Sequence, residues 1–230
     1  MFIINNILIL QTNRFVTDSP STLRGFIASR FPDNPLLHHH LNNPNKKGLV
    51  YTYPKVQYKI IDGTPMILGI GEAKEIVKTI SNIDYLNLKG KRYLVTEKKL
   101  IEQDVNFSVS EDLLTYKFLS PWLALDEESY KRYRKRNPEE RQKQLESILV
   151  GNIISMAKGL EYVIIDKITA LVDVKEVPTS LKSTPMLGFL GTFSVNFEIP
   201  DYWGIGKSVS RGFGTVKRQT TDDRRTGKQK

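Results

Sequence analysis

The sequence predicts an α+β fold of two tandem ferredoxin-like units, each ordered βαββαβ, with a glycine-rich loop towards the C-terminus. In the first hundred residues, apolar side chains recur every two residues in the expected strands and every 3.6 residues in the expected helices. These segments follow in the order strand, helix, strand, strand, helix, strand. The second half repeats this plan in its architecture, without sequence identity to the first. With 230 residues, 40% of them hydrophobic, the chain is long enough for two small domains.

The first strand and helix follow from the opening residues. The apolar run of Phe2–Gln11 predicts a strand, because it is too short to span a bilayer and lacks a basic leader. Ser19 and Pro20 are typical of an N-cap and a first helical residue. The expected apolar stripe of this helix, which leaves Arg24 and Arg30 outside, is Leu23, Phe26, Ile27 and Phe31.

A hairpin and a second helix complete the N-terminal domain, expected over residues 1–102. Lys55–Ile60 alternates and predicts a half-exposed strand. Val56, Tyr58 and Ile60 would face inward, and Lys55, Gln57 and Lys59 outward. Asp62 and Gly63 indicate a turn, after which Met66–Ile70 returns as the partner strand. Ala73, Ile76, Val77 and Ile80 mark the next helix, and a fourth strand is expected within Arg92–Thr96.

The C-terminal domain is expected over residues 103–216. Strand material near Val105–Val109 precedes a short charged helix, Asp126–Arg136. A long helix then begins at Pro138, with Asn137 as N-cap and Glu140 as the capping-box acid. Strands are expected again from Tyr162, with alternation over Lys167–Val174 and, without exception, over Thr192–Ile199. Residues 217–230 are polar and are expected to be disordered.

Charge and cysteine content narrow the classes of function. The formal charge of +9 creates a positive field that attracts polyanions, most often nucleic acid. The absence of cysteine excludes disulfides, thiolate zinc sites and cysteine nucleophiles, and it fits a reducing compartment. We therefore expect a soluble, cytoplasmic protein that does not contact membrane, since no segment pairs a basic face with exposed bulky aromatics.

The segment Gly204–Gly214 predicts an anion-binding loop. It holds four glycines, two serines and two cations in eleven residues, so its backbone amides, hydroxyls and charges can converge on phosphate oxygens. The residues expected to bind are Gly204, Gly206, Lys207, Ser208, Ser210, Arg211, Gly212 and Gly214. The spacing excludes a P-loop and a dinucleotide fingerprint, because Asp201 and Val209 stand where those motifs need glycine. Composition alone leaves open a glycine-rich turn with incidental charges.

Two regions resemble one protein family. Ile199–Trp203 followed by Gly204–Val216 resembles the C-terminal glycine-rich loop of the RAMP superfamily of CRISPR-associated proteins. Leu23–Gly25, the histidines after the first helix and the strand Tyr53–Lys59 are similar to the Cas6 repeat-processing endoribonucleases of that superfamily, and the His-x-His arrangement to their b subtype. The resemblance implies that the chain binds CRISPR repeat RNA, cuts the precursor within its repeats, and holds the RNA backbone with the glycine-rich loop.

The three histidines of the chain are consecutive, at His38, His39 and His40. In an extended segment, which the flanking prolines favour, His38 and His40 point to the same side. A polar loop without a role and an incidental metal site both remain open, although zinc would need ligands from elsewhere in the fold. The resemblance implies metal-independent cleavage without a cofactor, with His38 and His40 as general acid and base and a 2′,3′-cyclic phosphate and 5′-hydroxyl as products. Sequence proximity makes Arg30, Lys46, Lys47 and Tyr51 candidate donors to the phosphate.

A basic cluster and a rival function complete the predictions. Seven cations lie between Lys131 and Lys143, and either a solvated face or an RNA contact accounts for them. The alternative function is a non-catalytic RAMP subunit that binds guide RNA beside other CRISPR effector subunits. Two imidazoles next to a basic helix favour the enzyme over this alternative. The sequence leaves open whether the product RNA is retained and whether two copies form a homodimer.

Overall fold

The computed structural model describes residues 1–32, 34, 37 and 53–220. Its contacts divide the chain into two compact units. The N-terminal unit comprises Phe2–Val105 together with the short segment Val209–Gly212. The C-terminal unit comprises Met1, Asn106–Ser208 and the residues from Phe213 on. None of the helices in the described ranges is long and apolar enough to cross a membrane.

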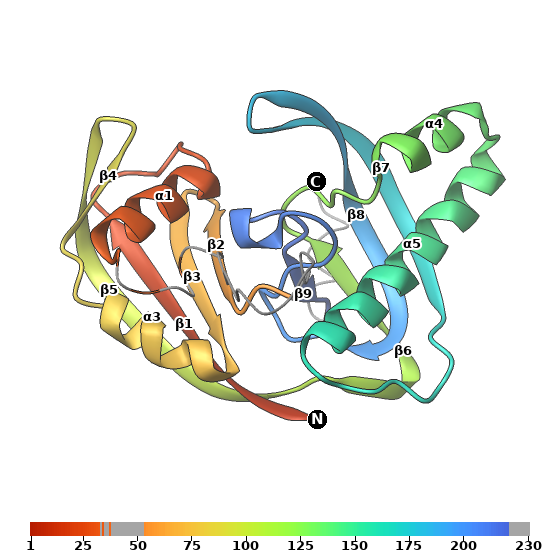
Figure 1. Ribbon diagram of the computed structural model, residues 1–230, viewed down its shortest axis with the longest axis horizontal. Coiled ribbons are helices and arrows are strands. Elements are labelled where there is room, and N and C mark those ends of the chain that lie inside the picture. The colour runs from red at the N-terminus through yellow and green to blue at the C-terminus, as the bar shows by residue number, and fades with distance from the viewer. Residues whose placement is uncertain (33, 35–36, 38–52, 221–230) are drawn as a thin grey trace, which may run out of the picture. The chain divides into compact units, whose positions relative to one another are not determined.

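The described residues of the N-terminal unit form a five-stranded sheet together with helices (Figure 1). Its strands, in the order β2-β3-β1-β5-β4, are β1 (Phe2–Thr12), β2 (Val56–Ile61), β3 (Thr64–Ile70), β4 (Tyr85–Leu88) and β5 (Lys91–Asn106). The helices that are described over their full length are α1 (Pro20–Arg30) and α3 (Lys74–Ile80), and α3 is preceded by the short 3₁₀ turn η1 (Gly71–Ala73). With β5 as the fourth strand, this is the predicted βαββαβ order. The hairpin strand β4 was not predicted.

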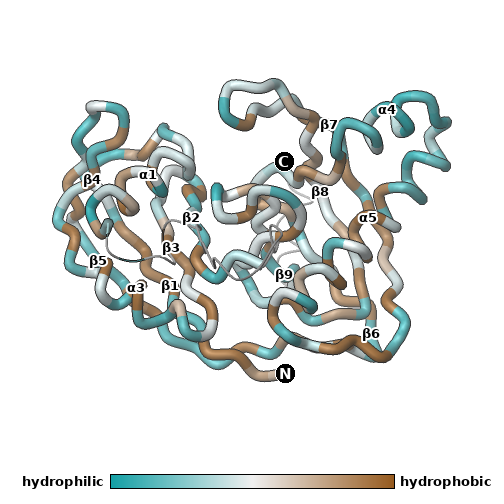
Figure 2. Tube along the Cα trace, viewed as in Figure 1, coloured by the Kyte–Doolittle hydropathy of each residue, from teal (hydrophilic) through white to brown (hydrophobic). Residues whose placement is uncertain are grey.

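Helices α1 and α3 contribute to one apolar core. Leu23 and Ile27 of α1 and Val77 of α3 are buried with Leu8 and Ile67 from the sheet. The predicted start of α1 is confirmed, because the Ser19 hydroxyl accepts a hydrogen bond from the Thr22 amide at 3.4 Å. Figure 2 shows the apolar segments running along β1 and β3.

The prediction that β2 is half exposed is wrong. Gln57 and Lys59, which were expected on an open face, are 0% and 1% exposed. The Lys59 ammonium group donates to Gln57 Oε1 at 3.0 Å, and burial lowers the pKa of Lys59 to about 7. An alternating pattern shows that the two faces of a strand differ, and it does not show that either face meets water.

The C-terminal unit repeats the strand order of the first. Its strands, in the order β7-β8-β6-β9, are β6 (Ser108–Phe118), β7 (Ala170–Leu181), β8 (Thr184–Glu198) and β9 (Val216–Arg218). The order β7-β8-β6-β9 matches β2-β3-β1-β5 of the first sheet, in which the extra strand β4 lies at the edge beside β5. The predicted tandem ferredoxin-like topology is therefore confirmed. The helices α4 (Glu127–Lys135) and α5 (Pro138–Gly159) follow β6. Between β8 and β9, the glycine-rich segment with the 3₁₀ turn η2 (Val209–Arg211) replaces the second helix.

Several boundaries in this unit differ from expectation. No strand begins at Tyr162, because the chain first pairs at Ala170. The β7–β8 hairpin is longer than the two alternating runs predicted, with pairs from Ala170↔Val195 to Leu181↔Thr184. The predicted helix starts are confirmed, since Asp126 with Ser129 and Asn137 with Glu140 form complete capping boxes.

Candidate nucleic-acid interface

The glycine-rich segment Gly204–Gly214 is a loop closed at its base. The Ile205 amide donates to the Gly214 carbonyl at 2.9 Å, and the Gly214 amide donates to the Pro121 carbonyl at 2.9 Å. Two further amides of the loop are also bonded. The Lys207 amide donates to the Leu123 carbonyl, outside the loop, at 3.4 Å, and the Gly212 amide donates to the Val209 carbonyl, within it, at 3.0 Å. These four amides are therefore occupied by backbone carbonyls, and an anion would have to use others.

Three glycines of the loop are required by packing, and one of them, Gly212, has a φ of +84° and would bring a Cβ to 2.5 Å from Pro20 Cγ. Gly206 has a φ of +89°, and a Cβ there would lie 2.6 Å from Trp122 Nε1. Trp122 Nε1 in turn donates to Asn152 Oδ1 at 3.0 Å, so the indole is fixed beneath the loop. Gly214 has a φ of +62°, and its Cβ would meet the Ile205 carbonyl oxygen. The glycine content is thus explained at these positions by close packing, whatever the loop binds.

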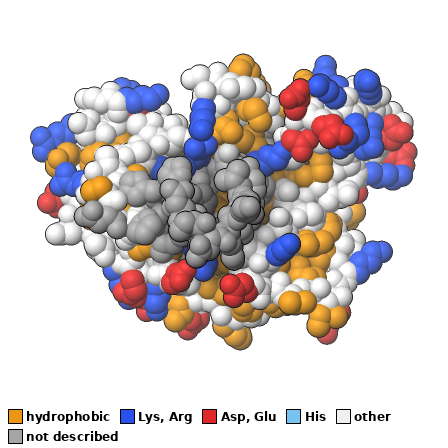
Figure 3. Space-filling model, in the orientation of Figure 1, with side chains coloured by type: hydrophobic (Ala, Val, Ile, Leu, Met, Phe, Trp, Pro, Cys, Tyr) orange, Lys and Arg blue, Asp and Glu red, His pale blue; other side chains and the backbone are white. Residues whose placement is uncertain are grey.

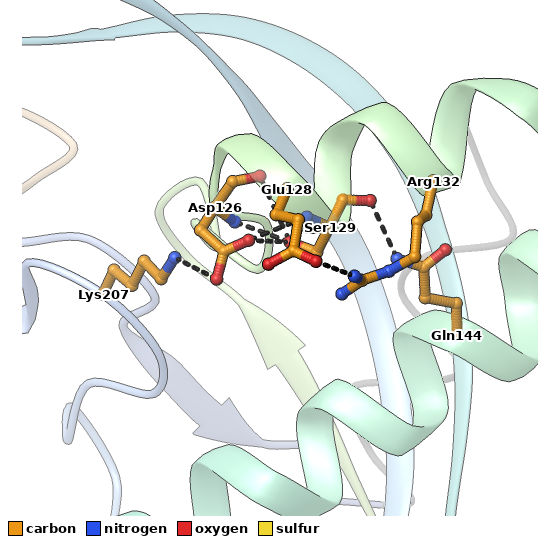
Figure 4. A network of polar contacts seen from close by, with 6 residues as sticks. All are labelled: Asp126, Glu128, Ser129, Arg132, Gln144 and Lys207. Atoms are coloured by element: carbon orange, nitrogen blue, oxygen red, sulfur yellow. Dashed lines mark hydrogen bonds and ion pairs between the residues drawn. The ribbon is translucent and has the colours of Figure 1, made fainter.

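Lys207, one of the two predicted cationic ligands, forms an ion pair. Its Nζ lies 3.5 Å from Asp126 Oδ2, the N-cap carboxylate of α4 (Figure 4). Hydrogen bonds from the Ser129 amide and hydroxyl, with a smaller contribution from Lys207, lower the pKa of Asp126 to about 2. Both side chains are largely exposed, at 44% and 62%, so this pair contributes at most about 1 kcal/mol to stability and leaves Lys207 available to an anion.

The remaining predicted ligands of the loop lie in different surroundings. Ser210 is buried, with 8% of its surface exposed, whereas Ser208 is half exposed and has a φ of +58°. Arg211 belongs to the N-terminal unit by its contacts and lies close to Arg24 of α1. Burial first, and then the charge of Arg211, lower the pKa of Arg24. Sequence reasoning left Arg24 out of the site, because its spacing only marked it as a polar position of α1.

Arg30 lies on the exposed last turn of α1 and contacts an aromatic ring. Its guanidinium donates to the Tyr85 hydroxyl at 2.9 Å and lies 5.0 Å from the centre of the Tyr85 ring. Arg92 lies on the same ring at 4.5 Å. The other residues predicted for catalysis or phosphate contact, His38, His40, Lys46, Lys47 and Tyr51, fall outside the described residues. Among the residues that are described, no group of three or more His, Asp or Glu could hold a metal ion.

Two family models match the chain almost end to end. One, described as the Cas6b N-terminal domain, matches residues 3–106, and the other, the Cas6b C-terminal domain, matches residues 108–219. An uncharacterized protein of Methanocaldococcus jannaschii is 44% identical over 140 residues, which are 60% of this chain and 95% of that protein.

Two solved structures are similar over the same length. A structure titled "Crystal structure of Cas6b" has 34% identity and a TM-score of 0.87, and covers 95% of this chain and 100% of its own. Another, titled "Crystal structure of CRISPR RNA processing endoribonuclease Cas6b", has 33% identity and a TM-score of 0.76, with the same coverage of both chains.

Proposed function

The chain belongs to the Cas6b family, and from this membership we propose that it is an endoribonuclease that cuts CRISPR precursor RNA within its repeats. The observation that carries the proposal is the likeness to a solved structure titled as a CRISPR RNA processing endoribonuclease, at 33% identity over 95% of this chain. The positive charge of +9 supports it, because an RNA substrate is a polyanion.

The proposed chemistry is metal-independent attack of a ribose 2′-hydroxyl on the adjacent phosphorus. The 2′-oxygen forms a bond to phosphorus while the bond to the 5′-oxygen breaks, which leaves a 2′,3′-cyclic phosphate and a free 5′-hydroxyl. One group must take the proton of the 2′-hydroxyl and another must give a proton to the leaving oxygen. His38 and His40 supply these groups, since an unperturbed imidazole has a pKa of about 6.5 and all imidazoles of the chain are adjacent.

Substrate holding is assigned to the glycine-rich loop and to basic residues near the histidines. Lys207, Arg211, Ser208 and Ser210 would contact phosphates, with Gly204, Gly206, Gly212 and Gly214 allowing the backbone to approach. Support comes from the exposure of Lys207 and from the weak ion pair that it makes with Asp126. Arg30, Lys46, Lys47 and Tyr51 are the candidates for contacting the phosphate under attack.

The test is cleavage of a labelled CRISPR repeat RNA in the presence of EDTA. We expect the wild-type protein to cut, and His38→Ala and His40→Ala each to lower the rate constant by about 100-fold or more while RNA affinity is retained. His39→Ala is the matched control, because in an extended segment alternate side chains would point to opposite sides, and this variant should cut at nearly the wild-type rate.

Three outcomes would count against the proposal. Loss of all cleavage in EDTA would contradict metal independence. Full activity of both histidine variants would contradict the assigned acid and base. Tight RNA binding without cleavage by the wild-type protein would favour the alternative of a non-catalytic subunit that holds guide RNA.

A further inference from the structure

A cavity of about 340 Å³ lies between the helices α4 and α5 of the C-terminal unit, outside the glycine-rich loop. Three cations line it, Arg132, Arg136 and Lys143, together with the uncharged polar residues Ser129, Gln144 and Ser147. No carboxylate is among the described residues that line it. We name this cavity the α4–α5 groove.

The floor of the groove is a built hydrogen-bond network. Gln144 is 8% exposed, and its Nε2 donates to the Ser129 carbonyl at 3.0 Å, which joins α5 to α4. Its Oε1 accepts from Arg136 Nη1 at 3.0 Å, so the guanidinium is oriented before any ligand arrives. Because a fixed donor loses little conformational freedom on binding, Arg136 is suited to hold an anion.

The turn between the two helices is also fixed. Arg141 Nε donates to the Tyr133 carbonyl at 3.0 Å, and its Nη2 donates to the Arg134 carbonyl at 3.2 Å. These bonds add partners to carbonyls in the last turn of α4, one of which, that of Tyr133, also accepts a hydrogen bond from the Arg136 amide at 3.2 Å. Arg141, which does not line the groove, therefore helps Gln144 to hold α5 against α4.

Arg132 and Lys143 form the rim and are held only weakly. Arg132 pairs with Glu128 at 2.7 Å and Lys143 with Glu139 at 2.6 Å. All four side chains are more than half exposed, and pairs of this kind contribute less than about 1 kcal/mol. A phosphodiester could replace these carboxylates at little cost. Figure 3 shows acidic and basic side chains interleaved over this part of the surface, and Figure 2 shows α4 as mostly hydrophilic.

The groove is linked to the glycine-rich loop through one residue. Asp126 caps α4, bonds Ser129 at the groove, and pairs with Lys207 of the loop at 3.5 Å. Figure 4 shows Lys207, Asp126, Ser129 and Gln144 in sequence from the loop to the groove. We propose that the α4–α5 groove is a second anchoring site for the phosphate backbone of RNA, adjoining the loop. This rests on the proposed function, and continuity with the loop favours RNA over an acidic protein.

The test compares two triple variants with the same change in charge. Arg132→Gln, Arg136→Gln and Lys143→Gln together should weaken binding of the repeat RNA by about tenfold or more. They should also make the slope of log affinity against log salt shallower by about 2, since each phosphate contact contributes roughly 0.7 on single-stranded RNA. The control, Lys131→Gln, Arg134→Gln and Lys135→Gln, removes three cations of α4 that do not line the groove, and it should change both quantities much less.

A single variant guards against misfolding of the triple variant. Lys143→Glu reverses a side chain that is 71% exposed, and its expected effect is several-fold weaker RNA binding with an unchanged melting temperature. Equal losses in both triple variants, or wild-type affinity in Lys143→Glu and the groove variant, would overturn the proposal. Unchanged RNA affinity with reduced binding of polyglutamate would instead assign the groove to an acidic protein.

The same assay separates this inference from the proposed function. If the wild-type protein cuts repeat RNA and the groove variant binds it normally, the inference fails and the function stands. If the wild-type protein binds repeat RNA without cutting it, and the groove variant binds it less tightly than the control does, the function fails and the groove remains an RNA site.

Discussion

At the scale of single residues, Lys59 is the side chain whose surroundings fit its chemistry least. A lysine at 1% exposure loses the hydration of its ammonium group, and burial lowers its pKa to about 7. The sequence could not reveal this, because Lys59 occupies the polar face of an alternating strand. Burial of that face is a property of the folded chain and not of the local pattern.

Lys59 should make stability depend on pH. Between the folded pKa of about 7 and an unfolded value near 10.4, the unfolded state binds more protons, so the free energy of unfolding rises with pH across this window. Lys59→Met should remove that rise, and its stability relative to wild type should be greatest at about pH 7 or below and should decline towards pH 10. Urea denaturation at several pH values measures the slope.

Lys55→Met is the matched control for this prediction. Lys55 lies just before the same strand, is 36% exposed and pairs with Glu72 at 2.8 Å. Its removal takes away one lysine without touching the buried one, so the rise in stability above pH 7 should persist. An identical pH slope in wild type and Lys59→Met would show that Lys59 stays charged in the folded protein.

At the scale of elements, the residues at which the helices begin were predictable, and the length of the strands was not. The starts of α1, α4 and α5 depend on Ser19, Asp126 and Asn137, whose side chains each accept from the amide three residues on. The outer half of the β7–β8 hairpin, in contrast, mixes polar and apolar residues, is partly exposed and contains Pro178. Its pairing is set by the partner strand, so no periodicity within either strand shows it.

The glycine-rich loop is the element for which packing and binding must be separated. Gly206→Ala should lower the free energy of unfolding by about 2–4 kcal/mol, because a side chain at a φ of +89° is strained and its Cβ would lie 2.6 Å from Trp122 Nε1. Urea denaturation without RNA measures this. If Gly206→Ala is as stable as wild type, the loop does not pack on Trp122 as the structure describes.

Gly151→Ala provides the control for this substitution. Gly151 lies in α5 of the same unit, and nothing lies within 4 Å of a Cβ at that position. Alanine is preferred to glycine in a helix, so this variant should be as stable as wild type or more stable by up to about 1 kcal/mol. Opposite signs for the two alanine variants would show that the loop glycines are required by local geometry.

At the scale of the whole molecule, the repeated strand order was predictable and the site was predictable only in part. Periodicity found both ferredoxin-like units, because apolar faces must be buried wherever they occur. Composition found Lys207 and the loop. It does not show that Asp126 pairs with Lys207, because these residues are far apart in the sequence and meet only in the folded chain. It also does not show the α4–α5 groove, whose floor includes the hydrogen bond from Gln144 to the Ser129 carbonyl.

The charge of the whole chain leads to a prediction about RNA affinity and salt. If about five phosphates are contacted, log affinity should fall with log salt at a slope of about −3.5, which is roughly a 100-fold loss for a fourfold increase in salt.

Lys207→Gln should make the slope shallower by about 0.7 and leave the free energy of unfolding within about 1 kcal/mol of wild type, since its ion pair with Asp126 is exposed. Filter binding at several salt concentrations measures affinity, and single-turnover cleavage at saturating RNA should hardly change with salt, because the chemical step follows binding. An affinity that is independent of salt would mean that the net charge of +9 does not hold the RNA, and base contacts would then have to supply the binding energy.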